Sequence, residues 1–346
     1  MRRKLLTIGG VLLACIVFFS ALYLATRLVM PKYRETSVEG SLTAEYYRDP
    51  TPHDVLFVGD CEVFSNFSPV TLWQEYGIPS YIRGSAQQLV WQSYYLLEDA
   101  LKTETPKVVV YNVLALKYGA PQSEAYNRMT LDGMRWGRAK IGAIQASMTE
   151  DEDFLSYVFP LLRFHARWSE LKEEDWTYWL KRGESVSYQG YLLRTEVRPA
   201  TETPIPPVLK DSHLPETSMA WLSRMVALCR ERGITLVLIK SPSIEPYWYP
   251  EWDADVRAFA EENGLQYYNM LALGEQTGID LQTDTCDMGQ HLNADGAEKL
   301  SRWFGKVLLD TCALKDHRGD ARYETYYQAL CARYEADKAQ RRKEGN

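Results

Sequence analysis

Five short runs of residues, separated by stretches long enough to form helices, constrain the fold of this 346-residue chain more than any other feature. The first of them, residues 53–59, contains four consecutive apolar residues before Gly59, a pattern typical of a parallel strand buried on both faces. Periodic stretches indicate helices between the strands. We therefore expect an α/β fold of three layers (α/β/α, flavodoxin-like), built on a parallel sheet of about five strands. The strands are expected at 53–59, 79–83, 107–113, 234–240 and 266–270, and the helices at 87–102, 218–231 and 253–263.

The 22 residues from Leu5 to Thr26 carry no charge, and a helix of that length spans a hydrocarbon core of about 30 Å. A basic flank, Arg2-Arg3-Lys4, precedes them, so the positive-inside rule predicts a cytoplasmic N-terminus and an extracytoplasmic body. A cleaved signal peptide is the alternative, although the apolar run is longer than such peptides usually have. The expected location is the cell membrane, with a single transmembrane helix.

The composition excludes several classes of protein and partner. Hydrophobic residues make up 46% of the chain, which is typical of a globular protein. The formal charge is −7, and four basic residues with no acidic one lie in residues 1–30, which leaves −11 on residues 31–346. An acidic body disfavours nucleic acid or anionic lipid as a partner of the fold itself. The cysteines form no CxxC pair, and no ligand spacing indicates a metal, so we expect neither a metal nor a cofactor.

The chain divides into six expected segments. Residues 119–215 are too long for a simple connection and read as a helical insertion with a proline-rich connector, largely helical over 126–181. Within it, Thr149 and Glu152 have the spacing of a capping box that would open a helix running through Phe159. The segments are a cytoplasmic stub and transmembrane helix (1–30), a linker (31–50), the two parts of the α/β domain (51–118 and 216–312), the insertion (119–215) and a C-terminal amphipathic helix (313–346).

Two segments that follow predicted strands carry side chains suited to nucleophilic catalysis. Cys61 follows the first strand, and His291 precedes the last helix of the α/β domain. The carboxyl ends of parallel strands meet at one edge of a sheet, so a thiol and an imidazole could meet there. Asp287 or Asp284 could hold the other ring nitrogen of His291. A helix N-terminus or a nearby histidine would lower the pKa of the thiol below its usual value of about 8.5.

Two further stretches could contact a substrate or a surface. Tyr247, Trp248 and Trp252 follow the fourth strand, where aromatic rings could stack on sugars; local packing of the loop is the alternative. Basic residues of the insertion, Arg163 and Arg167 among them, could contact an anionic polymer or lipid headgroups, or form a solvated helix face.

The pattern resembles the SGNH, or GDSL, hydrolase superfamily over residues 52–116 and 216–310. Gly59-Asp60-Cys61 stands where that family has Gly-Asp-Ser, and His291-Leu292-Asn293 stands at its catalytic histidine. The resemblance implies that Cys61 is the nucleophile, that Asp287 orients His291, and that Gly84 and Asn112 donate to the oxyanion. The chain departs from the family in having Cys for Ser and four residues, not three, from Asp287 to His291.

The apolar N-terminal segment and the helical insertion look most like the membrane-anchored branch associated with alginate O-acetylation and teichoic-acid D-alanylation. That resemblance implies an enzyme, an acyl esterase or O-acyltransferase, that acts on a cell-envelope glycan or polymer through an acyl-Cys intermediate. The alternative is a catalytically degenerate scaffold with the same fold, which binds glycan or partners a membrane-bound O-acyltransferase.

Overall fold

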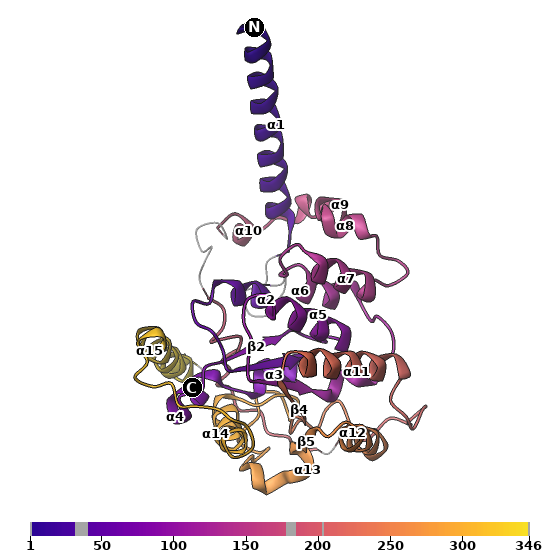
Figure 1. Ribbon diagram of the computed structural model, residues 1–346, viewed down its shortest axis with the longest axis vertical. Helices are drawn as coiled ribbons and strands as arrows, with labels where there is room; N and C mark the ends of the chain where they lie inside the picture. The colour runs from indigo at the N-terminus through magenta and orange to yellow at the C-terminus, as the bar shows by residue number, and fades with distance from the viewer. Residues whose placement is uncertain (1, 32–40, 178–184, 203, 345–346) are drawn as a thin grey trace.

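In the computed structural model, the body of the protein is a five-stranded, all-parallel sheet with the strand order β2-β1-β3-β4-β5. Figure 1 shows the whole chain, with helices packed around this sheet. The structure describes residues 2–31, 41–177, 185–202 and 204–344. All five strands lie where the sequence predicts them. Their bounds are β1 (Val55–Gly59), β2 (Ser80–Gly84), β3 (Val108–Asn112), β4 (Thr235–Lys240) and β5 (Gln266–Asn269).

Helices cover both faces of the sheet because the central strands are apolar on both sides. In β1, Val55 and Phe57 face one hydrophobic cluster, and Leu56 and Val58 face the other. The first cluster is covered by α3 (Cys61–Asn66), α4 (Pro69–Tyr76), α13 (Met270–Leu273), α14 (Ala294–Thr311) and α15 (Ala321–Glu344). The second is covered by α5 (Val90–Ala100), α11 (Glu216–Glu231) and α12 (Pro250–Glu262). The predicted three-layer α/β/α fold is therefore confirmed.

The insertion consists of short helices rather than long ones. The predicted helix start at Thr149 is wrong: the helix begins at Phe154, and the carboxylate of Asp153 caps it by accepting from the Leu155 N–H. Glu152 does accept from the Thr149 N–H at 3.0 Å, so the two residues pair without starting a helix. The elements are α6 (Glu124–Leu131), α7 (Arg138–Ser147), α8 (Phe154–Val158), α9 (Leu161–Phe164), η4 (His165–Glu170) and α10 (Glu173–Thr177). Residues 178–181 of the predicted helical stretch lie outside the described residues.

The N-terminal helix α1 (Arg2–Val29) projects from the body in Figure 1. Its residues Leu6–Val29 form the one helix among the described residues that is long and apolar enough to cross a membrane. Its contacts with the body are near its C-terminal end, where Val29 and Met30 are buried and α9, η4 and α10 approach it. Arg167 donates to the Val29 carbonyl there at 2.7 Å.

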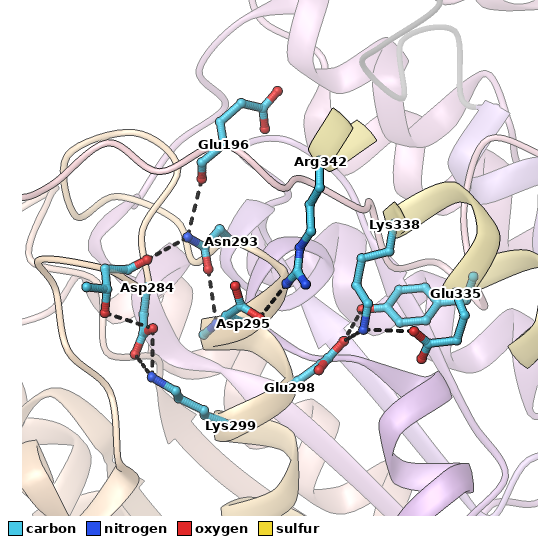
Figure 2. Close-up of polar contacts among 12 residues, drawn as sticks. Glu196, Asp284, Asn293, Asp295, Glu298, Lys299, Glu335, Lys338 and Arg342 are labelled. Atoms are coloured by element: carbon cyan, nitrogen blue, oxygen red, sulfur yellow. Dashed lines mark hydrogen bonds and ion pairs between the residues drawn. The ribbon is translucent and has the colours of Figure 1, made fainter. Parts of the chain in front are cut away.

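The helix α15 is docked on the body by a stripe of buried side chains, Tyr323, Tyr327, Leu330 and Tyr334. The ring of Tyr327 stacks on Trp73 of α4 with 4.0 Å between the centroids. Polar contacts with α14 flank this stripe: Lys338 and the Tyr334 hydroxyl donate to Glu298, and Arg342 pairs with Asp295 (Figure 2).

A loop covers β2, which lies at one edge of the sheet. The Ile82 N–H, on that strand, donates to the Gln189 carbonyl at 2.9 Å. The next residue, Gly190, has φ +84, and a Cβ there would lie 2.0 Å from the Ile82 carbonyl oxygen. Only glycine fits this close approach. Four further short elements belong to the described body: α2 (Ser41–Glu45), η2 (Tyr46–Arg48), η3 (Val113–Lys117) and η6 (Gly274–Thr277), which follows α13.

Candidate active site

Cys61 is the first residue of α3 and lies at the carboxyl edge of β1. The carboxylate of Asp60 caps this helix by accepting from the Glu62 N–H at 3.1 Å. The turn is tight, because Gly59 has φ +153 and a Cβ on Gly84 would lie 2.6 Å from Val63. The two glycines are paired in the sheet, so they let α3 approach the ends of β1 and β2 closely. The half-buried Cys61 side chain is thereby fixed at the sheet edge.

The surroundings of Cys61 keep its thiol protonated. Burial raises its pKa well above the usual value, and the charges of Asp60 and Glu62 raise it further. The backbone N–H groups of Cys61 and Gln87 act in the opposite direction, with a smaller effect. This corrects the expectation that the helix N-terminus and a histidine lower the thiol pKa. A resting thiolate is therefore disfavoured in this site.

Beneath Cys61 lies a buried polar network. Lys240, at the end of β4, donates to Glu62 at 2.9 Å and to the Ser241 carbonyl at 2.8 Å, and both charged side chains are buried. The two hydrogens of the Asn112 amide point at Asp60 and Glu62, at 3.0 and 2.8 Å. The network thus joins the ends of β1, β3 and β4 through hydrogen bonds that satisfy the buried charges.

The predicted oxyanion donors occupy different settings. Asn112 uses both amide hydrogens within the buried network, and its carbonyl oxygen accepts from the Ser241 N–H at 3.1 Å. To donate to a substrate it would have to release a carboxylate. Gly84 lies beside the first turn of α3, and its role as a donor stays a prediction.

His291 is held by Asp287, not by the alternative Asp284. Nδ1 of His291 lies 2.6 Å from the Asp287 carboxylate, which also accepts from the His291 backbone N–H at 2.7 Å. Burial alone would raise the pKa of Asp287, but these two hydrogen bonds and the charge of His291 outweigh it and lower that pKa. Asp284 instead pairs with Lys299 at 2.8 Å (Figure 2).

The loop that carries His291 is fastened to the helix that begins at Cys61. The Leu292 N–H donates to Asn66, the last residue of α3, at 2.8 Å, and the Asn66 amide donates in turn to the hydroxyls of Ser241 and Ser243. Asn293 holds the other side of the loop, where its amide donates to carbonyls of Glu196 and Thr283 (Figure 2). Among the described residues, no hydrogen bond joins the Cys61 thiol to His291. The two side chains are therefore on linked elements without a direct bond.

The aromatic loop after β4 serves mainly to pack the protein. Trp248 is buried in the second hydrophobic cluster, and Trp252 packs against it. Their rings meet edge to face, 5.6 Å apart. The buried ring of Trp248 favours the packing alternative, and a role of Trp248 or Trp252 in binding substrate stays a prediction. Tyr247 is half-buried against Tyr249, and its role in binding stays a prediction.

All six cysteines are unpaired in the structure, including Cys286 beside the His291 loop. The Cys286 thiol donates to the carbonyls of His291 and Leu292 at 3.6 Å, and burial raises its pKa to about 11. It is thus a supporting residue of the loop. Within the described ranges, no cluster of three or more His, Cys, Asp or Glu side chains could hold a metal ion.

Four residues around Cys61 are not predicted from the sequence as members of the site: Glu62, Asn66, Lys117 and Lys240. A charged residue that ends a buried apolar strand, as Lys240 does, is the signal that could have found one of them. Lys117 lies at the end of η3, near Asp60 and Glu62, and burial lowers its pKa. Gln87 has φ +50, an uncommon conformation for a residue with a side chain, and nothing in the sequence marks it.

Comparisons with known proteins add a loose structural likeness. No protein-family model and no curated protein matches the chain. Among solved structures, it is similar to a crystal structure from Bacteroides fragilis NCTC 9343 that is described as "a putative acylhydrolase". The two share 10% identity over 78% of this chain and 94% of that chain, with a TM-score of 0.39. A likeness at that level assigns no activity to this chain.

Proposed function

We propose that the chain is a membrane-anchored acyl esterase or O-acyltransferase of the SGNH type. Cys61 is the nucleophile, His291 is the general base and acid, and Asp287 orients the imidazole. The observation that carries the proposal is the His291–Asp287 pair at 2.6 Å, on a loop whose Leu292 N–H is bonded to the helix that begins with Cys61. This pairing fixes the imidazole with its Nε2 available to take a proton.

In the proposed reaction, the Cys61 sulfur attacks the carbonyl carbon of an ester or thioester as His291 removes the thiol proton. The tetrahedral intermediate collapses, the bond to the leaving group breaks, and His291 returns the proton to the departing oxygen or sulfur. The product is an acyl-Cys thioester. A sugar hydroxyl or water then attacks the thioester carbonyl as His291 takes its proton. The carbon–sulfur bond breaks, and His291 returns the proton to the departing Cys61 sulfur, which regenerates the thiol.

Because the pKa of Cys61 is raised, the thiol loses its proton as the sulfur attacks the carbonyl carbon, and no thiolate forms before that step. That is the way in which a serine works with histidine. Backbone N–H groups beside the nucleophile, with Gly84 as a further donor, hold the oxyanion, and each is worth about 3 to 4 kcal/mol in comparable sites. Asn112 acts through the buried network instead.

The proposed location follows from α1 and its basic flank: the N-terminus is cytoplasmic and the body is extracytoplasmic. The proposed acceptor is a cell-envelope glycan or polymer, and the proposed partner is a membrane-bound O-acyltransferase. An acidic body with a charge of −11 outside residues 1–30 favours uncharged sugar hydroxyls over nucleic acid.

The test is acyl transfer by the full chain in detergent micelles, with p-nitrophenyl acetate as donor and mass spectrometry of the acyl-enzyme. We expect acetylation of the Cys61 peptide, no turnover with Cys61→Ala or His291→Ala, and retained turnover with Cys61→Ser. The matched control is Cys331→Ala, since Cys331 is equally half-buried but lies on α15. A Cys61→Ala protein that turns over normally would refute the mechanism.

A second candidate function is a non-catalytic scaffold that binds glycan or couples to an integral acyltransferase. Two observations favour it: the raised pKa of Cys61, and the engagement of both Asn112 amide hydrogens on carboxylates. Such a scaffold would co-purify with its partner unchanged after Cys61→Ala and His291→Ala, and Cys61 would gain no acyl group from any donor.

A further inference from the structure

A group of large apolar side chains is exposed on the insertion. Leu155, Phe159, Leu162, Trp168 and Trp176 are each 50% or more exposed, and Trp168 reaches 73%. They lie within 22 residues of one another, on or beside α8, α9, η4 and α10. We call these five side chains the juxtamembrane face.

The juxtamembrane face is not an extension of the core. None of its residues belongs to the three hydrophobic clusters of the described body. Single exposed apolar residues are normal on a soluble surface, but five large ones gathered in one segment usually mark a contact with a partner or a membrane.

The position of the juxtamembrane face identifies its partner. The helices α9 and α10 and the segment η4 contact α1 near the end of its apolar stretch, and Arg167, next to Trp168 in sequence, donates to the Val29 carbonyl at 2.7 Å. In Figure 1, α10 lies on one side of the base of α1 and α8 and α9 lie on the other, whereas the strands lie farther from it. A membrane crossed by α1 would end at the level of these helices.

We infer that the juxtamembrane face inserts into the interfacial layer of the bilayer that α1 crosses. Tryptophan is the residue best suited to this layer, because its ring is apolar and its N–H can bond to headgroups. Short helices with apolar side chains on one face bind there in the same way. The inference rests on the membrane anchoring proposed above and is independent of the chemistry of Cys61.

The insertion then gives the body a second attachment to the membrane. A single transmembrane helix leaves a body free to rotate and tilt, whereas a second contact beside the helix fixes its orientation. The carboxyl edge of the sheet would thereby keep a constant height and direction relative to the lipid surface.

The test uses the full chain in nanodiscs of phosphatidylcholine that carries bromine atoms on its acyl chains near the interface. Bromine quenches the fluorescence of tryptophans that enter the lipid. We compare the wild type with Trp168→Phe/Trp176→Phe, which keeps two apolar rings and so preserves the fold. The matched control is Trp221→Phe/Trp303→Phe, a pair of half-buried tryptophans on α11 and α14, away from α1 in Figure 1.

We expect the quenched fraction of the fluorescence to fall clearly in Trp168→Phe/Trp176→Phe. In the control pair we expect it to rise slightly, because that pair removes two tryptophans that bromine does not reach. Equal quenching in the wild type and Trp168→Phe/Trp176→Phe would overturn the inference. So would a chain that fails to enter nanodiscs, because α1 would then not span the bilayer. A catalytically inactive chain that shows the expected quenching would refute only the acyl-transfer proposal.

Discussion

The buried carboxyl of Asp60 gives the sharpest test of the electrostatics around Cys61. Burial and the charge of Glu62 raise the pKa of Asp60 from 3.8 to about 6. The folded protein therefore binds this proton more tightly than the unfolded chain does. The stabilising contribution is fully present below pH 4 and is lost as the pH rises through 6. A difference of about two pH units, at 1.36 kcal/mol each, makes it about 3 kcal/mol.

The substitution Asp60→Asn removes the titration while keeping a side-chain oxygen to cap α3 at the Glu62 N–H. Relative to the wild type, the variant should gain about 3 kcal/mol of unfolding free energy between pH 4 and pH 7. The assay is urea unfolding of the full chain in detergent micelles at several pH values, followed by circular dichroism. The control is Asp310→Asn, at an exposed position of α14. A constant difference between wild type and Asp60→Asn across this range would refute the reasoning.

Three further predictions concern stability and are read from the same urea assay at pH 7. Lys240→Met leaves Glu62 buried without its cation and should lower the free energy of unfolding by about 3 to 5 kcal/mol. Adding Glu62→Gln to the same chain should restore most of this loss. A loss under about 1 kcal/mol would mean that water reaches the pair. Tyr327→Ala empties a buried site against Trp73 and should cost about 3 to 5 kcal/mol, whereas an unchanged midpoint would show that α15 is not docked. In Gly190→Ala the added Cβ would clash with the Ile82 carbonyl, so this substitution should destabilise the protein more than Gly233→Ala does. At Gly233 a Cβ would enter open space, and only the left-handed backbone costs about 1 kcal/mol. Equal losses of unfolding free energy would contradict the close approach at Gly190.

Much of the fold could be predicted because the sheet imposes a local pattern on the sequence. A strand buried on both faces must be apolar throughout, so Val55–Gly59 and Val108–Asn112 are visible without knowledge of their neighbours. The short helices of the insertion were harder to predict. Their ends depend on single caps such as Asp153, and Thr149 with Glu152 offers the same residue types one turn earlier.

The candidate site could be predicted only in part. Cys61 and His291 stand at positions where chain topology brings strand ends together, and that placement follows from element order alone. Asp287 rather than Asp284 contacts His291 because Asp284 is paired with Lys299, a contact that the sequence does not reveal. The burial of Trp248 depends in the same way on the residues of the second hydrophobic cluster that pack around its ring. The buried pair of Glu62 and Lys240 joins residues 178 positions apart, and no local pattern encodes such a contact.

The loop over β2 also governs how copies of the protein behave toward one another. An edge strand offers unpaired backbone groups that can recruit a strand from a second molecule and start aggregation. In this protein the Ile82 N–H, which would be open to such pairing, is already bound to the Gln189 carbonyl. The glycine that follows allows that bond to form. A larger residue at position 190 would therefore leave the backbone of β2 open to pairing with a strand of another copy of the chain. The protection of this edge thus depends on a residue that has no part in the sheet itself.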